Sequence, residues 1–153
     1  LKQRRPGWTI LGLDQSEAAL SLAKENGVEL ELEVEWSLGD ILGPLDLLPQ
    51  TKMDVIVSNP PYIPPSEQDK MGASTLQFEP DLALYASEED PLEFYRHIME
   101  WGRDVLAENG RIYLECNEFN SEQVLKLSEE LGYSGAERFR DLQGKWRMLR
   151  MER

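Results

Sequence analysis

Asn59-Pro60-Pro61-Tyr62 is the stretch of this 153-residue sequence with the clearest chemical content. An asparagine carboxamide offers one acceptor and two donors, and the Pro60 carbonyl is an acceptor on a residue without an N–H. Together these groups can hold a planar amide or amino group, and Tyr62 can stack on its plane. None of them is a strong base, so they suit attack by a neutral nitrogen on an already activated electrophile.

The segment that must position Asn59 is the apolar run in front of it. Three consecutive apolar residues, Val55-Ile56-Val57, predict a strand over residues 54–59 that is buried on both faces. The prolines end this strand and hold Asn59 extended, so its carboxamide is expected at the carboxyl end, where ligands bind in open α/β sheets. Asn-Pro alone is more typical of a simple turn. The complete four-residue run at the end of an apolar strand favours the functional interpretation.

Two segments of the sequence are similar to a known enzyme family. Asn59-Pro60-Pro61-Tyr62 resembles the signature of methyltransferases that use S-adenosylmethionine to methylate planar sp² nitrogens. Residues 78–84, Phe-Glu-Pro-Asp-Leu-Ala-Leu, resemble a segment of the HemK/PrmC branch, which methylates the glutamine of the Gly-Gly-Gln loop of peptide-chain release factors. The resemblance extends from about Gly12 to Met151.

The resemblance implies roles for the residues around this signature. Asn59, Pro60 and Tyr62 would be catalytic, and these three would bind the substrate together with Pro61 and Glu79. Residues 63–90, which leave directly from the signature, contain several prolines and little periodicity. A segment of this kind and length is typical of a lid or binding loop, and we expect it to cover the substrate.

Asp14 follows a predicted strand and precedes a predicted helix, where an acid can accept hydrogen bonds from a ribose diol. Asp14 could equally cap the helix beside Ser16, and the residues alone favour that capping role. The resemblance reverses the preference. It implies that Asp14 binds the ribose of S-adenosylmethionine, Asp40 its adenine amine and Ile41 the adenine ring, with Asn59 also contacting the cofactor.

Periodicity and turn signals predict the element order β-α-β-β-α-β-α-β-β. The predicted strands cover residues 8–13, 28–36, 54–59, 111–116, 136–142 and 146–151, and the predicted helices cover residues 16–26, 90–108 and 121–131. A left-handed Gly27 is expected to end the first helix, an Asp90-Pro91 cap to start the second, and Gly132 to end the third. Gln143-Gly144 is expected to join the last two strands as a hairpin.

The resemblance implies an α/β fold, a Rossmann-like class I methyltransferase sheet with a C-terminal antiparallel hairpin. The family's first strand and glycine-rich loop have no counterpart in this sequence, nor does its amino-terminal substrate domain. We therefore expect residues 1–153 to be a partial catalytic domain that binds S-adenosylmethionine weakly or not at all by itself.

The charge balance bears on the class of partner. Acidic residues outnumber basic ones by 29 to 16, which gives a formal net charge of −13. Such a surface repels phosphate backbones, so we expect a protein or small-molecule substrate and no direct contact with nucleic acid. The resemblance implies that the protein partner is a peptide-chain release factor. The sequence has no apolar run of membrane-spanning length and no secretory signal. The single cysteine, Cys116, fits a cytoplasmic location.

Metal binding is not expected. His97 is the only histidine, lacks companions at ligand spacing and is expected to be exposed. Four alternating glutamates from Glu29 to Glu35 read as the solvated face of an edge strand.

Two alternatives to glutamine methylation remain open at this point. The same four-residue signature could serve the amino group of a flipped nucleic-acid base. The chain could also be an inactive, truncated relative that pairs with another subunit.

Overall fold

The computed structural model describes residues 1–63 and 80–153. The chain forms two compact units, Leu1–Pro49 and Gln50–Arg153, each with its own β-sheet.

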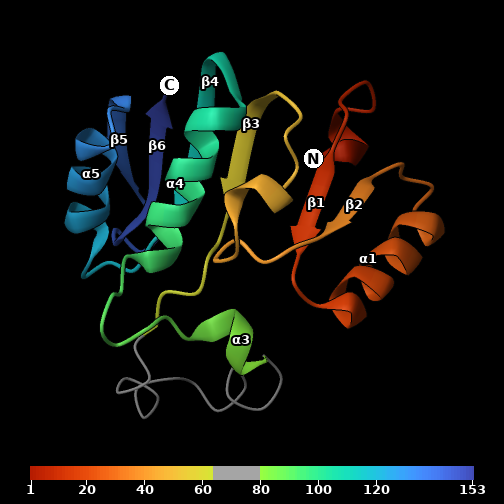
Figure 1. Cartoon of the computed structure of the whole chain (residues 1–153), viewed down its shortest axis with the longest axis horizontal. Helices are drawn as coiled ribbons and strands as arrows, with labels where there is room; N and C mark the ends of the chain where they lie inside the picture. The colour runs from red at the N-terminus through yellow and green to blue at the C-terminus, as the bar shows by residue number, and fades with distance from the viewer. Residues whose placement is uncertain (64–79) are drawn as a thin grey trace. The chain divides into compact units, whose positions relative to one another are not determined.

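The first unit is a parallel strand pair with one long helix (Figure 1). Its elements are η1 (Lys2–Arg4), β1 (Leu11–Asp14), α1 (Glu17–Glu29), β2 (Glu35–Leu38) and η2 (Leu45–Leu47). β1 and β2 pair from Leu11 opposite Glu35 to Asp14 opposite Leu38. Ser16 caps α1, because its side chain accepts a hydrogen bond from the Ala19 N–H at 3.2 Å.

The predicted strand over residues 28–36 is wrong except at its last two residues, because β2 begins only at Glu35. Residues 28 and 29 continue α1, so Gly27 lies inside the helix and does not end it. The chain turns at Glu31, which has a φ of 53°, and the Leu32 N–H bonds to the Gly27 carbonyl at 2.8 Å. Val28 is 81% exposed. The alternation of apolar and acidic residues therefore did not indicate a strand here, because Val28, the apolar residue at its start, is not buried.

The second unit is a four-stranded mixed sheet in the order β3-β4-β6-β5. Its elements are β3 (Met53–Ser58), α3 (Asp81–Leu84), α4 (Glu93–Val105), β4 (Leu106–Glu115), α5 (Ser121–Glu130), β5 (Ser134–Arg140) and β6 (Trp146–Glu152). β3 and β4 are parallel, whereas β6 runs antiparallel to both β4 and β5. The predicted C-terminal hairpin is confirmed, and Gly144 takes the left-handed conformation in its turn with a φ of 81°.

Helices α4 and α5 cover one face of the sheet (Figure 1), and the core of this unit lies between them and the strands. The buried side chains include Ile56, Leu106, Ile112, Leu114, Leu149 and Met151 from the strands, Phe94, Tyr95, Ile98, Met99, Trp101 and Val105 from α4, and Val124 and Leu127 from α5. Val55 and Val57 point to the opposite face and are 40% and 60% exposed. β3 is thus buried on one face, not both, because α4 and α5 lie on the same side of it.

The start of α4 differs from the predicted cap. The helix begins at Glu93, and Leu92 occupies the N-cap position without a side-chain bond. Asp90 instead stabilises the turn that precedes the helix. Its Oδ1 accepts a hydrogen bond from the Leu92 N–H at 3.0 Å, and its Oδ2 forms an ion pair with Arg96 at 3.3 Å.

The ends of the helices are explained by the backbone that follows them. α4 stops at Val105 rather than residue 108, and β4 begins directly at Leu106, five residues before the predicted start. Asn109 takes a left-handed φ of 64° within this strand, whose register against β3 shifts there. The end of α5 was predicted correctly, with Gly132 at a φ of 82°.

Candidate functional site

The carboxyl end of β3 presents the predicted signature. The strand stops at Ser58, one residue earlier than expected; Asn59 is exposed and Pro60 is buried. None of the described residues hydrogen-bonds the Asn59 carboxamide, so its donors and its acceptor are available to a ligand. Burial of the Pro60 ring anchors the backbone next to this exposed side chain.

The Tyr62 phenol is held by the neighbouring strand. Its hydroxyl donates to Glu115 Oε1 at 3.0 Å, and the ring is half-buried. Burial, followed by the negative charge of Glu115, raises the pKa of Tyr62 from 10.0 to about 12, against a smaller lowering by Arg147. Tyr62 is therefore a neutral phenol at physiological pH; its O–H is donated to Glu115, and its ring can stack on a ligand, but the phenol cannot act as a base.

Backbone bonds fix the residue after Tyr62. The Ile63 N–H donates to the Leu84 carbonyl at 3.1 Å, and the Ala86 N–H donates to the Ile63 carbonyl at 3.0 Å. Ile63 thereby forms an isolated parallel bridge with Tyr85. Residues 59–63 are consequently tied down on both sides of the phenol.

Sequence reasoning missed Glu115 and Tyr95 as residues of this site. The fully buried Tyr95, on α4, donates its hydroxyl to the Glu115 backbone carbonyl at 3.3 Å, and burial raises its pKa above the ordinary value. The position of Glu115 in the sheet could have identified it as a residue of this site. Glu115 ends β4, and the pairing of Ser58 with Leu114 puts the next residues, Asn59 and Glu115, level with each other.

The predicted nucleoside-binding residues gather at the carboxyl ends of β1 and β2. Asp14 ends β1 opposite Leu38, and its backbone carbonyl accepts from the Gly39 N–H at 3.0 Å, which ties the Gly39-Asp40 turn to it. Asp14 and Asp40 are both exposed. Ile41, which follows Asp40 in the sequence, is half-buried. The structure therefore brings Asp14 and Asp40 to one edge of this sheet.

Each of these carboxylates has one oxygen committed to its own loop. Asp14 Oδ1 accepts from the Ser16 N–H at 2.8 Å, and Asp40 Oδ1 accepts from the Leu42 N–H at 2.9 Å. Within the part of the chain that the structure describes, the second oxygen of each is open to a hydroxyl or amine donor. Ser16, not Asp14, caps α1. These two acceptors fit the ribose hydroxyls and the adenine amine of a nucleoside.

The predicted residues divide between the two units. Asp14, Asp40 and Ile41 belong to Leu1–Pro49, whereas Asn59 to Tyr62 belong to Gln50–Arg153. Glu79 lies outside the described residues, as does most of the expected lid.

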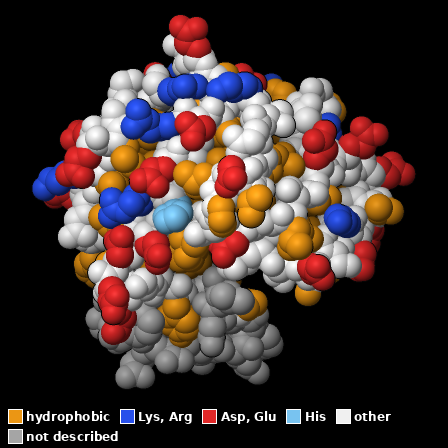
Figure 2. Space-filling model, viewed as in Figure 1, with side chains coloured by type: hydrophobic (Ala, Val, Ile, Leu, Met, Phe, Trp, Pro, Cys, Tyr) orange, Lys and Arg blue, Asp and Glu red, His pale blue; other side chains and the backbone are white. Residues whose placement is uncertain are grey.

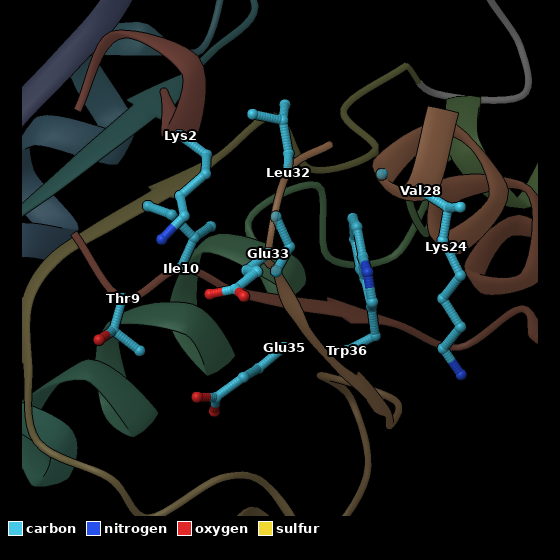
Figure 3. Close-up of a pocket in the computed structure, with 11 residues that line it drawn as sticks. Lys2, Thr9, Ile10, Lys24, Val28, Leu32, Glu33, Glu35 and Trp36 are labelled. Atoms are coloured by element: carbon cyan, nitrogen blue, oxygen red, sulfur yellow. The ribbon is translucent and has the colours of Figure 1, made fainter. Parts of the chain in front are cut away.

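A hollow of about 440 Å³ in the first unit contains none of the predicted site residues (Figure 3). Its walls come from the amino-terminal side of the strand pair and the second half of α1. They are formed by Lys2, Thr9, Ile10, Lys24, Gly27, Val28 and residues 32–36. Because Asp14 and Asp40 follow the carboxyl ends of the strands, this hollow is separate from the predicted nucleoside site.

The other titratable groups offer little chemistry. Cys116 is fully buried, and burial raises its pKa from 9.0 to about 11, so it packs as an apolar residue. His97 is half-buried rather than exposed, with an unpaired Nδ1. Among residues 1–63 and 80–153, no cluster of three metal-ligating side chains occurs. Glu29, Glu31, Glu33 and Glu35 are all exposed to solvent.

Many acidic side chains are exposed on the surface, as the acidic composition leads one to expect. Figure 2 shows acidic side chains spread over the face in view, with basic side chains among them. In the described portions of the chain, no helix is both long and apolar enough to cross a membrane.

Comparisons with known proteins agree with this geometry. The family model for the methyltransferase small domain matches residues 1–78. The release factor glutamine methyltransferase of Bacteroides thetaiotaomicron is 37% identical over 153 residues, which are all of this chain and 55% of that protein. Its counterpart from Streptococcus pneumoniae is 40% identical over 115 residues, which are 75% of this chain and 39% of that protein. The chain spans about half the length of the curated relatives that it matches.

Solved structures share the fold at low sequence identity. A methyltransferase from Pyrococcus furiosus matches with a TM-score of 0.69 and 19% identity, covering 99% of this chain and 66% of that one. A ribosomal protein L11 methylase from Lactobacillus delbrueckii matches with a TM-score of 0.63 and 16% identity, covering 95% and 57%. The fold is the Rossmann-like α/β fold predicted from the sequence. With the family model matching more than half of its residues, the chain belongs to the methyltransferase small domain family.

Proposed function

We propose that the protein carrying this chain transfers a methyl group from S-adenosylmethionine to the side-chain amide nitrogen of a glutamine in a peptide-chain release factor. The observation that carries this proposal is the exposed Asn59 carboxamide at the carboxyl end of β3, next to the buried Pro60 and the anchored Tyr62. The relatives described above are release factor glutamine methyltransferases, and they supply the substrate class.

The substrate amide would be held by two acceptors. The Asn59 carboxamide oxygen accepts one N–H of the glutamine, and the Pro60 carbonyl accepts the other. An amide nitrogen is a poor nucleophile because its lone pair is delocalised. Acceptors on both N–H groups return electron density to that nitrogen and fix its direction. Tyr62 is a neutral phenol, and the edge or the face of its ring lies against the plane of the substrate amide.

S-adenosylmethionine supplies a methyl group on a positively charged sulfur, which needs no further activation. The glutamine nitrogen held by Asn59 and Pro60 would take this methyl group as the C–S bond breaks, and it would then release one proton to solvent. Asp14 and Asp40 accept hydrogen bonds from the ribose hydroxyls and the adenine amine, while Ile41 covers the ring.

We also infer that residues 1–153 are part of a larger catalytic sheet. Among the strands in the described ranges, β1 pairs only with β2, and β3 pairs on one side only, with β4. Each therefore has an edge of backbone donors and acceptors without a strand partner, and parallel strands are normally covered on both sides. A location in the cytoplasm, where release factors act, follows from the proposed substrate.

The test is mass spectrometry of a release factor after incubation with the natural protein and S-adenosylmethionine. We expect one added methyl group on the glutamine of the Gly-Gly-Gln loop, and none on a release factor whose loop glutamine is changed to glutamate. Methyl transfer to DNA or RNA, with none to the release factor, would replace this proposal with the base-amine alternative.

A further inference from the structure

Glu115 lies beside the proposed substrate-binding residues but has no role in the mechanism above. It is the last residue of β4, level with Asn59 in the register of the parallel β3–β4 pair. Its carboxylate accepts the Tyr62 hydroxyl at 3.0 Å, across 53 positions of sequence. This is a side-chain bond between the signature loop and the adjacent strand.

The main chain of Glu115 is held independently of its side chain. The buried Tyr95 hydroxyl donates to the Glu115 carbonyl at 3.3 Å, and Glu115 pairs with Met148 on β6. Loss of the carboxylate therefore removes a contact to Tyr62 without removing the strand's own anchors. The side chain is half-buried, so its loss opens no large cavity.

The Tyr62 side chain has little else to direct it. Ile63 is fixed through its backbone to residues 84 and 86, and Pro60 is buried, but these contacts set the loop and not the orientation of the phenol ring. The bond to Glu115 is the one hydrogen bond of the Tyr62 hydroxyl in the described structure. A charged acceptor makes this bond stronger than a neutral one would.

We propose that Glu115 is a positioning residue that holds the Tyr62 ring beside Asn59, so that the ring confines the plane of the bound amide. This role rests on the proposed function, because the amide belongs to the glutamine substrate. Glu115 touches neither the substrate nor the cofactor in this account. Its effect on turnover passes entirely through Tyr62.

The first test measures the contact between Tyr62 and Glu115 in the absence of substrate. Phenolate absorbance is titrated in the chain and in Glu115→Gln, each compared with the same protein carrying Tyr62→Phe. We expect the Tyr62 signal, at a pKa of about 12, to move toward 10 when the charge of Glu115 is removed. Glu137→Gln is the matched control: it removes a carboxylate of the same sheet that pairs with Arg150 at 3.3 Å. An unchanged Tyr62 titration in Glu115→Gln would overturn the proposal.

The second test separates positioning from structure in the natural protein. We expect Glu115→Ala to lower kcat for release-factor methylation roughly 10-fold, with the KM for S-adenosylmethionine unchanged. In a Tyr62→Phe background the same substitution should have no further effect, because its route to the substrate is already lost. Additive losses in the two backgrounds would overturn the role of Glu115. Absence of methylation by the unsubstituted protein would instead refute the proposed function.

Discussion

Gly12 lies where a methyl group has no room. It sits in β1 directly opposite Trp36 of β2, and a Cβ built on it would be 2.3 Å from Cζ3 and 2.4 Å from Cε3 of the indole ring. Ordinary contact begins at 3.4 Å, so the ring would have to move by about 1 Å. Trp36 is half-buried, so the indole ring or the strands must shift to make room.

The magnitude follows from two opposing effects of Gly12→Ala. Overpacking of this kind costs about 1–3 kcal/mol, whereas alanine gains about 0.5–1 kcal/mol over glycine in a strand through backbone entropy. Taking the middle of each range, we expect a net loss of about 1 kcal/mol in the free energy of unfolding. Since Asp14 is two residues further along β1, the same substitution should weaken S-adenosylmethionine binding in the natural protein.

Urea unfolding followed by circular dichroism measures this loss, and Gly7→Ala is the matched control. A Cβ at Gly7 meets nothing within 4 Å, so that variant should stay within about 0.5 kcal/mol of the parent. Trp36→Leu should relieve the clash, so that Gly12→Ala costs less in that background. If Gly12→Ala and Gly7→Ala are equally stable, contact between the indole and Gly12 does not limit this position.

Two further predictions concern titratable groups. The raised pKa of Tyr62, about 12 against 10.0, means that folding favours the neutral phenol. Its contribution to stability should be complete below pH 10 and lost as the pH rises through 12, so Tyr62→Phe should lose less stability across that window in pH-dependent urea unfolding. Cys116, with a pKa of about 11 against 9.0, should have roughly 100-fold less thiolate at pH 8 than an ordinary cysteine. Thiol-reactive dye should label it at the rate of unfolding, and rapid labelling of the native chain would contradict its burial.

The sequence was most informative where a local rule determines the structure. Two prolines after an apolar run required β3 to end beside Asn59, and it ends at Ser58. Gly132 follows the end of α5 and Gly144 lies in the hairpin turn, as predicted, and both take the left-handed conformation. These features depend on backbone sterics within a few residues, which pattern reading captures directly.

Prediction failed where tertiary contacts decide the structure. Alternation from residue 28 indicated a strand, but nothing buries Val28, and α1 continues through it. The burial of β3 on both faces was expected from its composition alone, which cannot reveal on which side α4 and α5 pack. Glu115 was missed for a related reason, because its bond to Tyr62 joins residues 53 positions apart. The roles of Asp14, Asp40, Asn59 and Glu79 stay predictions.

The central claim is that the Asn59 carboxamide orients a planar amide nitrogen for methylation. The most direct measurement is release-factor methylation by Asn59→Ala in the natural protein, together with its affinity for S-adenosylmethionine. Asn26→Ala, which changes an exposed asparagine in α1, controls for loss of an amide elsewhere. We predict that Asn59→Ala abolishes turnover and largely retains cofactor binding, whereas Asn26→Ala leaves both unchanged. Normal turnover by Asn59→Ala would contradict the account.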